Sequence, residues 1–334
     1  MPDTAKSNPE LAGFKEKLAG YIDTAQHHAK PYLDLPNDSF KKTVAVALAL
    51  CLVGAVVVSG SAVILKPLQE NNKSKDEKVN ILEVAGLLQP GTDVQTVFKG
   101  IETKIVDLSN GDYVTSVDAA TYDQWKAAKD PGSSEAIPAD KDIASIKRKP
   151  KYAKVYLVQE AGQLKTLILP VNGYGLWSTM YGFIALQADA QTVVGMNLYD
   201  QAETPGLGGE VVNPKWKELW KGKKVYNFTG KEMHESNLTE KGQTIDLGEV
   251  ALGLVKGGVD PSKPGAEYQV DALAGATLTS RGVSNLVKYW MGKDGYGVYL
   301  AKLRAQPKAK PAAPAPASAA TQAQDKGKAK AKAK

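Results

Sequence analysis

Cysteine and histidine are almost absent from this sequence of 334 residues. The one cysteine, Cys51, lies in the most apolar stretch. The chain therefore forms no internal disulfide and cannot by itself hold an iron–sulfur cluster or a cysteine-ligated zinc. The three histidines, His27, His28 and His234, show neither an H-E-x-x-H motif nor another paired-ligand spacing. We therefore expect no metal site and no histidine-based metal catalysis.

Excess positive charge is missing from the body of the chain, although the formal net charge is +6. Residues 305–334 contain seven lysines and one aspartate, which account for all of that excess. A domain that binds nucleic acid is expected to carry a basic face within its folded part, so no nucleic-acid partner is predicted. The same segment has no large apolar side chain to bury, which predicts a disordered tail.

One long uncharged apolar run covers residues 43–65 (TVAVALALCLVGAVVVSGSAVIL). As a helix it would rise about 35 Å, enough to cross a hydrocarbon core of about 30 Å. The run is too long, and begins too far into the chain, for a cleaved signal peptide. We predict an uncleaved single-pass anchor after an N-terminal segment, 1–42. Lysines flank both ends of the run, so the positive-inside rule leaves its orientation undecided.

Within the N-terminal segment, residues 11–22 place apolar side chains on one helical face. This pattern fits an interfacial or partner-docking helix and a solvated helix about equally well.

Beyond the span, residues 66–304 are predicted to form an α+β domain built mainly on antiparallel sheet. Alternating apolar residues and intervening turn residues predict three strand pairs, at 101–108 with 113–117, 152–158 with 164–170, and 183–186 with 192–198. Helical patterns occupy residues 78–88, 214–220 and 281–292.

The segment 271–280 (DALAGATLTS) places small residues around Thr277, just before the helical pattern that begins at residue 281. Thr279 or Ser280 suits the N-cap of that helix. Free amides and the positive end of the helix dipole would favour a phosphate on Thr277. On the residues alone, a Thr- and Ser-rich cap on an ordinary helix is the stronger interpretation.

Two further segments combine glycine with bulky side chains. Residues 173–183 (GYGLWSTMYGF) surround Trp177 and Met180 with glycine, which suits either a flat aromatic ligand or an aromatic core bend. Residues 203–209 (ETPGLGG) lack the G-x-G-x-x-G spacing of a nucleotide fingerprint, and no G-x-x-x-x-G-K-[ST] occurs anywhere. This second segment is either a ligand-side loop, with Glu203 as a polar contact, or a purely structural turn.

Taken together, these residues resemble the FMN-binding C subunit of sodium-translocating NADH:quinone oxidoreductases. Residues 271–277 are similar to the flavinylation motif D-G-x-S/T-G-A-T, with Ala272 in place of glycine and Ala274 in place of serine or threonine. The segments 78–87 (KVNILEVAGL), 173–183 and 203–208 also resemble that subunit, and all follow the family's order. Where the family often has a histidine before E-T-P-G, this chain has Tyr-Asp-Gln-Ala, so no histidine role is carried over.

The resemblance implies that Thr277 carries FMN through a phosphoester installed by a separate flavin transferase. It also implies an electron relay among other subunits of a membrane respiratory complex, from an iron–sulfur centre to another flavin and toward ubiquinone, coupled to sodium export. The location implied is the bacterial inner membrane, with the domain in the periplasm. Because no nicotinamide fingerprint is present, no complete activity and no catalytic residue is expected of this chain alone.

The expected FMN-binding residues lie in the three segments 173–183, 203–209 and 271–280. In addition to Thr277 they are Gly275, Ala276, Leu278, Thr279, Trp177, Ser178, Thr179, Met180, Glu203, Thr204, Leu207 and Gly208. Arg281 is either a phosphate contact or a surface arginine.

Two other functions stay open at this point. One is the covalent-FMN subunit of the complex that exchanges electrons between ferredoxin and NAD. The other is a membrane-anchored binding or assembly module without a cofactor.

Overall fold

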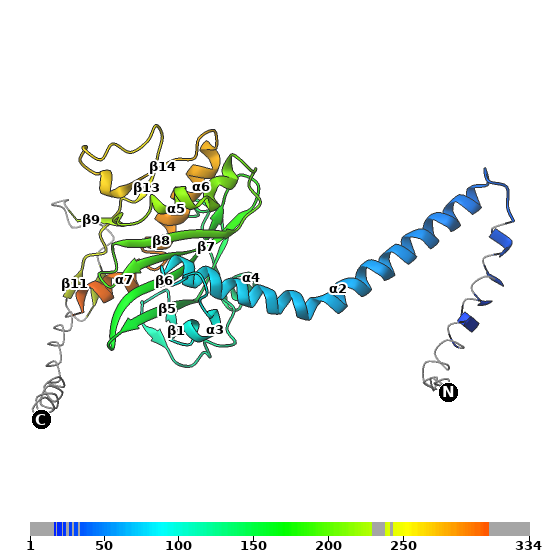
Figure 1. The fold of residues 1–334 in the computed structure, drawn as a ribbon, viewed down its shortest axis with the longest axis horizontal. Helices are drawn as coiled ribbons and strands as arrows, with labels where there is room; N and C mark the ends of the chain where they lie inside the picture. The colour runs from blue at the N-terminus through cyan, green and yellow to red at the C-terminus, as the bar shows by residue number, and fades with distance from the viewer. Residues whose placement is uncertain are drawn as a thin grey trace, which may run out of the picture. The chain divides into compact units, whose positions relative to one another are not determined.

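The computed structural model describes residues 34–228, 238–240 and 243–306, together with separate positions between 17 and 32. The chain divides into two units, residues 1–75 and 76–334, and the boundary falls inside helix α2 (Phe40–Val84). The predicted helix at 11–22 lies largely outside the described residues, and the predicted tail does so almost entirely. Figure 1 shows the elements in chain order.

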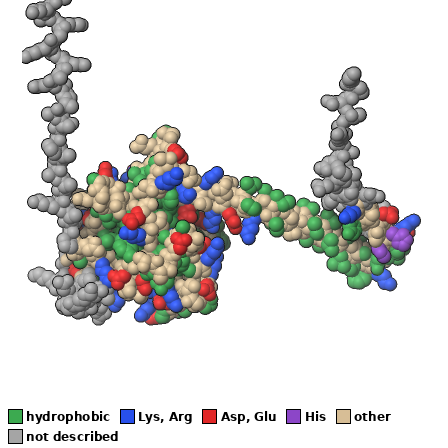
Figure 2. All heavy atoms as spheres, turned by 90° about the horizontal axis from the view of Figure 1, so that it is seen from below, with side chains coloured by type: hydrophobic (Ala, Val, Ile, Leu, Met, Phe, Trp, Pro, Cys, Tyr) green, Lys and Arg blue, Asp and Glu red, His purple; other side chains and the backbone are tan. Residues whose placement is uncertain are grey.

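Helix α2 is longer than the predicted anchor. It contains the whole apolar run 43–65 and continues without a break to Val84. The second helix predicted at 78–88 is therefore the end of this same helix, and it stops four residues before the predicted end. Its most apolar part has no buried residues, and Figure 2 shows hydrophobic side chains along its visible face. Within the described part of the chain, it is the one helix long and apolar enough to cross a membrane.

The second unit is built on a six-stranded antiparallel sheet of order β2-β1-β5-β6-β7-β8. The strands are β1 (Ile101–Asp107), β2 (Tyr113–Val114), β5 (Tyr152–Glu160), β6 (Gln163–Tyr174), β7 (Thr179–Gln187) and β8 (Val193–Asp200). All three predicted strand pairs are confirmed, although β2 ends at Val114, three residues before the predicted end of that strand. Strands β6 and β7 run further than predicted, because their pairing continues to Tyr174 and Thr179.

Shorter elements surround this sheet. The helices are α3 (Val94–Phe98), α4 (Gln124–Lys129), η1 (Gly208–Val212), α5 (Pro214–Glu218), η2 (Ala266–Tyr268), α6 (Thr277–Met291) and α7 (Gly297–Ala305). The strands are β3 (Ser134–Ala136), β4 (Arg148–Pro150), β9 (Tyr226–Asn227), β10 (Leu238–Glu240), β11 (Gln243–Ile245), β12 (Glu249–Val250), β13 (Gly253–Val255) and β14 (Gln269–Asp271). Strands β13 and β14 form a parallel pair.

Helices cover both faces of the sheet. Successive residues of a strand point to opposite faces, so neighbouring residues of β6 contact different helices. Leu167 and Leu169 of β6 belong to the core that includes α6, whereas Ile168 packs with Ile81 and Leu82 from the end of α2. Figure 1 shows α6 and the end of α2 against the same strands. The sheet therefore carries the end of α2 on one face and the helix that begins at Thr277 on the other.

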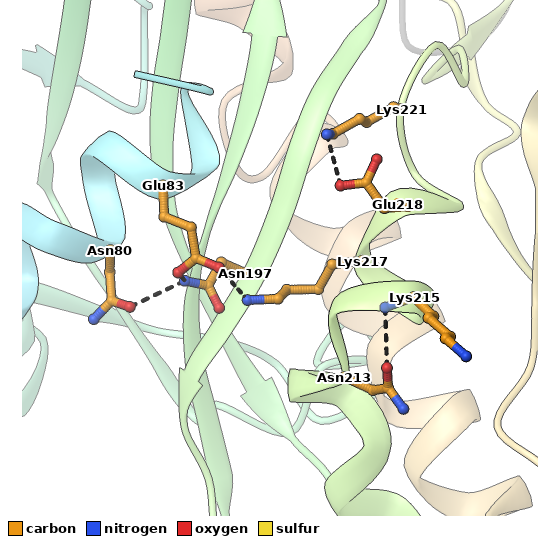
Figure 3. Close-up of polar contacts among 8 residues, drawn as sticks. All are labelled: Asn80, Glu83, Asn197, Asn213, Lys215, Lys217, Glu218 and Lys221. Atoms are coloured by element: carbon orange, nitrogen blue, oxygen red, sulfur yellow. Dashed lines mark hydrogen bonds and ion pairs between the residues drawn. The ribbon is translucent and has the colours of Figure 1, made fainter. Parts of the chain in front are cut away.

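A polar cluster fixes the end of α2 to the sheet (Figure 3). Asn197 of β8 donates from Nδ2 to Asn80 Oδ1 and to Glu83 Oε2, both at 3.0 Å. Lys217 of α5 forms an ion pair with Glu83. Asn197 is 3% exposed, so its amide needs these partners. The cluster holds β8 and α5, which precede and follow the loop 201–212.

We predict that Asn197→Ala lowers the free energy of unfolding by about 1–3 kcal/mol, because two acceptors lose a buried donor. The measurement is urea denaturation of the purified chain. Glu218→Gln is the control: its ion pair with Lys221 is more than half exposed and is worth at most about 1 kcal/mol. Equal unfolding midpoints for Asn197→Ala and the wild type would show that the cluster does not stabilise this docking.

Candidate functional site

Three segments that are distant in the sequence meet at one end of the sheet. The first is the turn 175–178 between β6 and β7, and the second is the loop 201–209 after β8. The third is the first turn of α6. Their meeting point is the side chain of Glu203, which is 4% exposed.

Each carboxylate oxygen of Glu203 serves a different segment. Oε1 accepts hydrogen bonds from the backbone amides of Leu176 at 2.9 Å and Trp177 at 3.0 Å. Oε2 accepts from Thr279 Oγ1 at 2.6 Å. Sequence analysis did not select Leu176, because a backbone donor leaves no signal in the side-chain pattern. One carboxylate thus joins all three segments.

Two glycines make room for this carboxylate. A Cβ atom on Gly175 would overlap Glu203 Oε1. A Cβ atom on Gly208 would stand 2.9 Å from Glu203 Oε2 and 2.5 Å from Thr279 Oγ1. A larger residue at Gly175 would displace the Glu203 carboxylate, and one at Gly208 would also displace Thr279, so both glycines have a steric role here.

The surroundings of Glu203 favour its ionised form. Burial opposes ionisation, but hydrogen bonds from Thr279 and from the backbone amides of Trp177, Leu176 and Ser178 outweigh it. These donors hold the pKa of Glu203 below its ordinary value. The site therefore contains a fixed negative charge.

Helix α6 begins four residues earlier than predicted, and the prediction that Thr279 or Ser280 caps it is wrong. The helix starts at Thr277, and its N-cap residue is Ala276, which makes no side-chain capping bond. Thr279 and Ser280 lie in the first turn, both buried. Their hydroxyls are engaged elsewhere: Thr279 donates to Glu203, and Ser280 Oγ accepts from the Leu273 amide at 3.0 Å.

The predicted contact residues separate into an exposed and a buried group. Trp177, Leu278 and Leu207 are 64%, 53% and 44% exposed. Thr277, Thr204 and Gly275 are also exposed. Met180, Glu203, Gly208, Ala276 and Thr279 are buried, and Ser178 and Thr179 are half-buried. The exposed group thus combines large apolar side chains with Thr277, and the buried group comes from the same three segments.

Short contacts order the exposed group. Trp177 Nε1 donates to Thr204 Oγ1 at 3.1 Å, which ties the indole to the loop 201–209. Ser178 Oγ accepts from the Ala202 amide at 2.9 Å. Gly275 has φ +71°, and a Cβ atom there would lie 3.0 Å from Leu207. Gly275 therefore permits both the left-handed turn before α6 and the close approach of Leu207.

A groove of about 720 Å³ lies between the pair β13–β14 and α6, and Thr277 is among the residues that line it. Lys256, Arg281 and Lys288 line it together with Thr277. Sequence analysis missed both lysines. Lys288 could have been found from its spacing, since residues 277, 281, 284 and 288 share one helical face. Lys256 lies in the turn directly after β13, far from α6 in the sequence, and leaves no such signal.

Asp271, the acidic residue of the flavinylation motif, has a structural partner. Its Oδ1 accepts from the Val259 amide at 2.6 Å, and its backbone oxygen accepts from Trp216 Nε1 at 2.9 Å. Asp271 therefore holds the turn at Gly257 and Gly258 against β14, on the wall of the groove.

Comparison with known proteins places these features in a family. An FMN-binding domain model matches residues 175–292, which include all three segments of the site. The C subunit of the Na(+)-translocating NADH-quinone reductase of Pseudomonas aeruginosa is 50% identical over 272 residues, which make up 80% of this chain and 97% of that protein. Its counterpart in Haemophilus ducreyi is 46% identical over 271 residues, with shares of 80% and 96%.

The fold agrees with a solved structure as well. The crystal structure of Shewanella oneidensis NqrC matches with a TM-score of 0.60 at 31% sequence identity. The match covers 70% of this chain and all of that one.

The lowered pKa of Glu203 predicts a pH-dependent stability. Since its folded-state pKa lies below the ordinary value of 4.5, its contribution is present above pH 4.5 and disappears as the pH falls through the folded-state pKa. Glu203→Gln has no such titration. In urea denaturation at a series of pH values, the stability advantage of wild type over Glu203→Gln should shrink from pH 6 to pH 3. A difference that stays constant over this range would contradict the assignment.

Proposed function

This chain belongs to the family of C subunits of Na(+)-translocating NADH-quinone reductases, and on that basis we propose that it carries FMN bound covalently through phosphate to Thr277. The observation that carries the proposal is that Thr277 is an exposed residue at the start of α6, where no side chain caps the helix. Amides at such a helix start point toward an anion, and the dipole favours negative charge there.

Positive side chains support a phosphate at this position. Arg281 follows Thr277 by one helical turn, and both line the groove together with Lys256 and Lys288. Helical side chains lean toward the helix N-terminus, so Arg281 is directed toward a group on Thr277. An arginine can donate two hydrogen bonds to a phosphate. We propose Arg281 as the phosphate partner.

The exposed apolar group suits the flat ring of a flavin. Trp177, Leu207 and Leu278 are largely exposed large side chains, and each belongs to a different one of the three segments that Glu203 joins. An aromatic ring system lying over them would remove apolar surface from water and gain stacking against the indole. We propose these residues, with Thr204, as the ring contacts, and Met180, Ala276 and Gly208 as the layer beneath.

Attachment requires an activated donor and an external catalyst. The bond formed joins Thr277 Oγ to the flavin's phosphorus, while the hydroxyl proton and a leaving group on phosphorus depart. A threonine hydroxyl is a weak nucleophile unless a base or a metal activates it. None of the residues that line the groove is a histidine. We therefore propose that a separate flavin transferase, acting on a flavin nucleotide with a good leaving group, modifies this chain.

The bound flavin supplies the redox chemistry, and the protein supplies attachment, orientation and local charge. We propose that the chain relays electrons from an iron–sulfur centre to another flavin, toward ubiquinone, within a sodium-pumping respiratory complex. A tether through phosphate keeps the cofactor from being lost and leaves the ring unmodified. The identity of 50% over most of the chain favours this assignment over the ferredoxin-linked complex.

We predict that the wild-type chain, produced with the transferase, gives a fluorescent band on a denaturing gel under ultraviolet light. Thr277→Ala should abolish this band, whereas Thr279→Ser, which keeps the buried hydroxyl, should retain it. The tryptic peptide 257–281 should gain the mass of FMN less one water, because Lys263 precedes proline and escapes cleavage. An unmodified wild-type peptide, or a fluorescent Thr277→Ala band, would refute the attachment site.

We further propose that the unit beyond the anchor lies in the periplasm of a bacterial inner membrane, as the family resemblance implies. Protease added to spheroplasts should then degrade the sheet domain without detergent. A cytoplasmic protein in the same sample is the control for intact cells. Protection of the domain until the membrane is dissolved would reverse the proposed orientation.

A further inference from the structure

The site separates charges of opposite sign. Lys256, Arg281 and Lys288 line the groove beside Thr277, whereas Glu203 lies beneath the loop and the turn that carry the exposed apolar side chains. Glu203 and Trp177 are not among the residues that line the groove. The three basic side chains of the groove thus suit the phosphate. The Glu203 carboxylate instead contacts the segments that carry the side chains proposed to hold the ring.

We propose that Glu203 is a positioning residue whose fixed negative charge lowers the reduction potential of the FMN carried by Thr277. This inference rests on the proposed attachment and extends it, because it assigns to one protein side chain the control of how readily the relay accepts an electron. No new chemical step is involved: the electron arrives from the donor subunit and leaves to the acceptor subunit.

Connectivity places the charge close to the cofactor. The hydroxyl that holds Oε2 belongs to Thr279, two residues after the attachment point, and one amide that holds Oε1 belongs to Trp177. The carboxylate is therefore hydrogen-bonded both to the helical turn that carries the attachment point and to the turn that carries Trp177, a proposed ring contact. Glu203 is 4% exposed, so water and salt screen it weakly.

The sign of the effect follows from this placement. Reduction adds negative charge to the flavin, and a nearby fixed carboxylate opposes that addition. The hydrogen bonds of Glu203 hold it in its ionised form and in place, so the effect persists at neutral pH. The same three bonds fix the turn and the helix start against each other, so one side chain sets both geometry and charge.

Two nearly isosteric substitutions separate charge from geometry. Glu203→Gln removes the charge but keeps an oxygen for the two amides and an amide nitrogen that can donate to Thr279. Thr279→Val keeps the charge but removes the hydroxyl that partly neutralises it. Glu218→Gln removes a surface carboxylate and serves as the matched control.

The experiment is a redox titration of the flavinylated full chain in detergent at pH 8, followed by flavin absorbance. We expect the midpoint potential to become more positive in Glu203→Gln and more negative in Thr279→Val, with Glu218→Gln equal to wild type. General loosening of the site would move the first two in the same direction. If Glu203→Gln does not fold, Thr279→Val alone tests the inference: a more negative midpoint potential supports it, and an unchanged or more positive one contradicts it.

Two results overturn the inference. One is a wild-type potential in both Glu203→Gln and Thr279→Val, or a shift of the same sign in both. The other is an equal shift in Glu218→Gln. A wild-type chain without covalent flavin would instead overturn the proposed function, and gel fluorescence measured before the titration tells the two failures apart.

Discussion

The architecture of the site depends on one buried carboxylate that must find hydrogen-bond donors away from water. An ionised side chain removed from solvent is tolerated only when its oxygens are satisfied. Glu203 obtains its donors from the turn between β6 and β7 and from the first turn of α6. Because its own loop follows β8, this single requirement draws three distant segments together. Gly175 and Gly208 make this arrangement sterically possible, since a side chain on either would occupy the space of the carboxylate.

The sheet connects the site to the rest of the domain. Its two faces carry the end of α2 and helix α6, and strand β8 leads directly into the loop that holds Glu203. Asn197 before that loop and Lys217 after it are both held by the end of α2. The loop is therefore fixed at both ends by the anchor helix and in its middle by the site. Such a frame suits a cofactor that must be held in a fixed orientation within a larger complex.

Local features of the sequence predicted the sheet well, because alternating apolar residues and glycine-bearing turns report directly on strand pairs. The three segments that the structure joins at Glu203 had also been selected from the sequence. Their division into an exposed and a buried layer was not predicted. It depends on the hydrogen bond between Thr279 and Glu203, which are 76 residues apart in the sequence. The cap prediction failed because the helix begins at Thr277, which places Thr279 and Ser280 inside its first turn. Helix α2 exceeded its prediction because polar residues after the span continue the helix to the buried Ile81 and Leu82.

The central claim, that Glu203 holds the three segments together, is tested most directly by hydrogen–deuterium exchange of the full chain, followed by mass spectrometry. In the wild type the backbone amides of Leu176 and Trp177 should be protected, because they donate to the carboxylate. In Glu203→Ala, peptides covering the turn 175–178 and the start of α6 should exchange much faster, while the β5–β6 hairpin keeps its protection. Unchanged exchange at the turn and at the helix start would contradict the account.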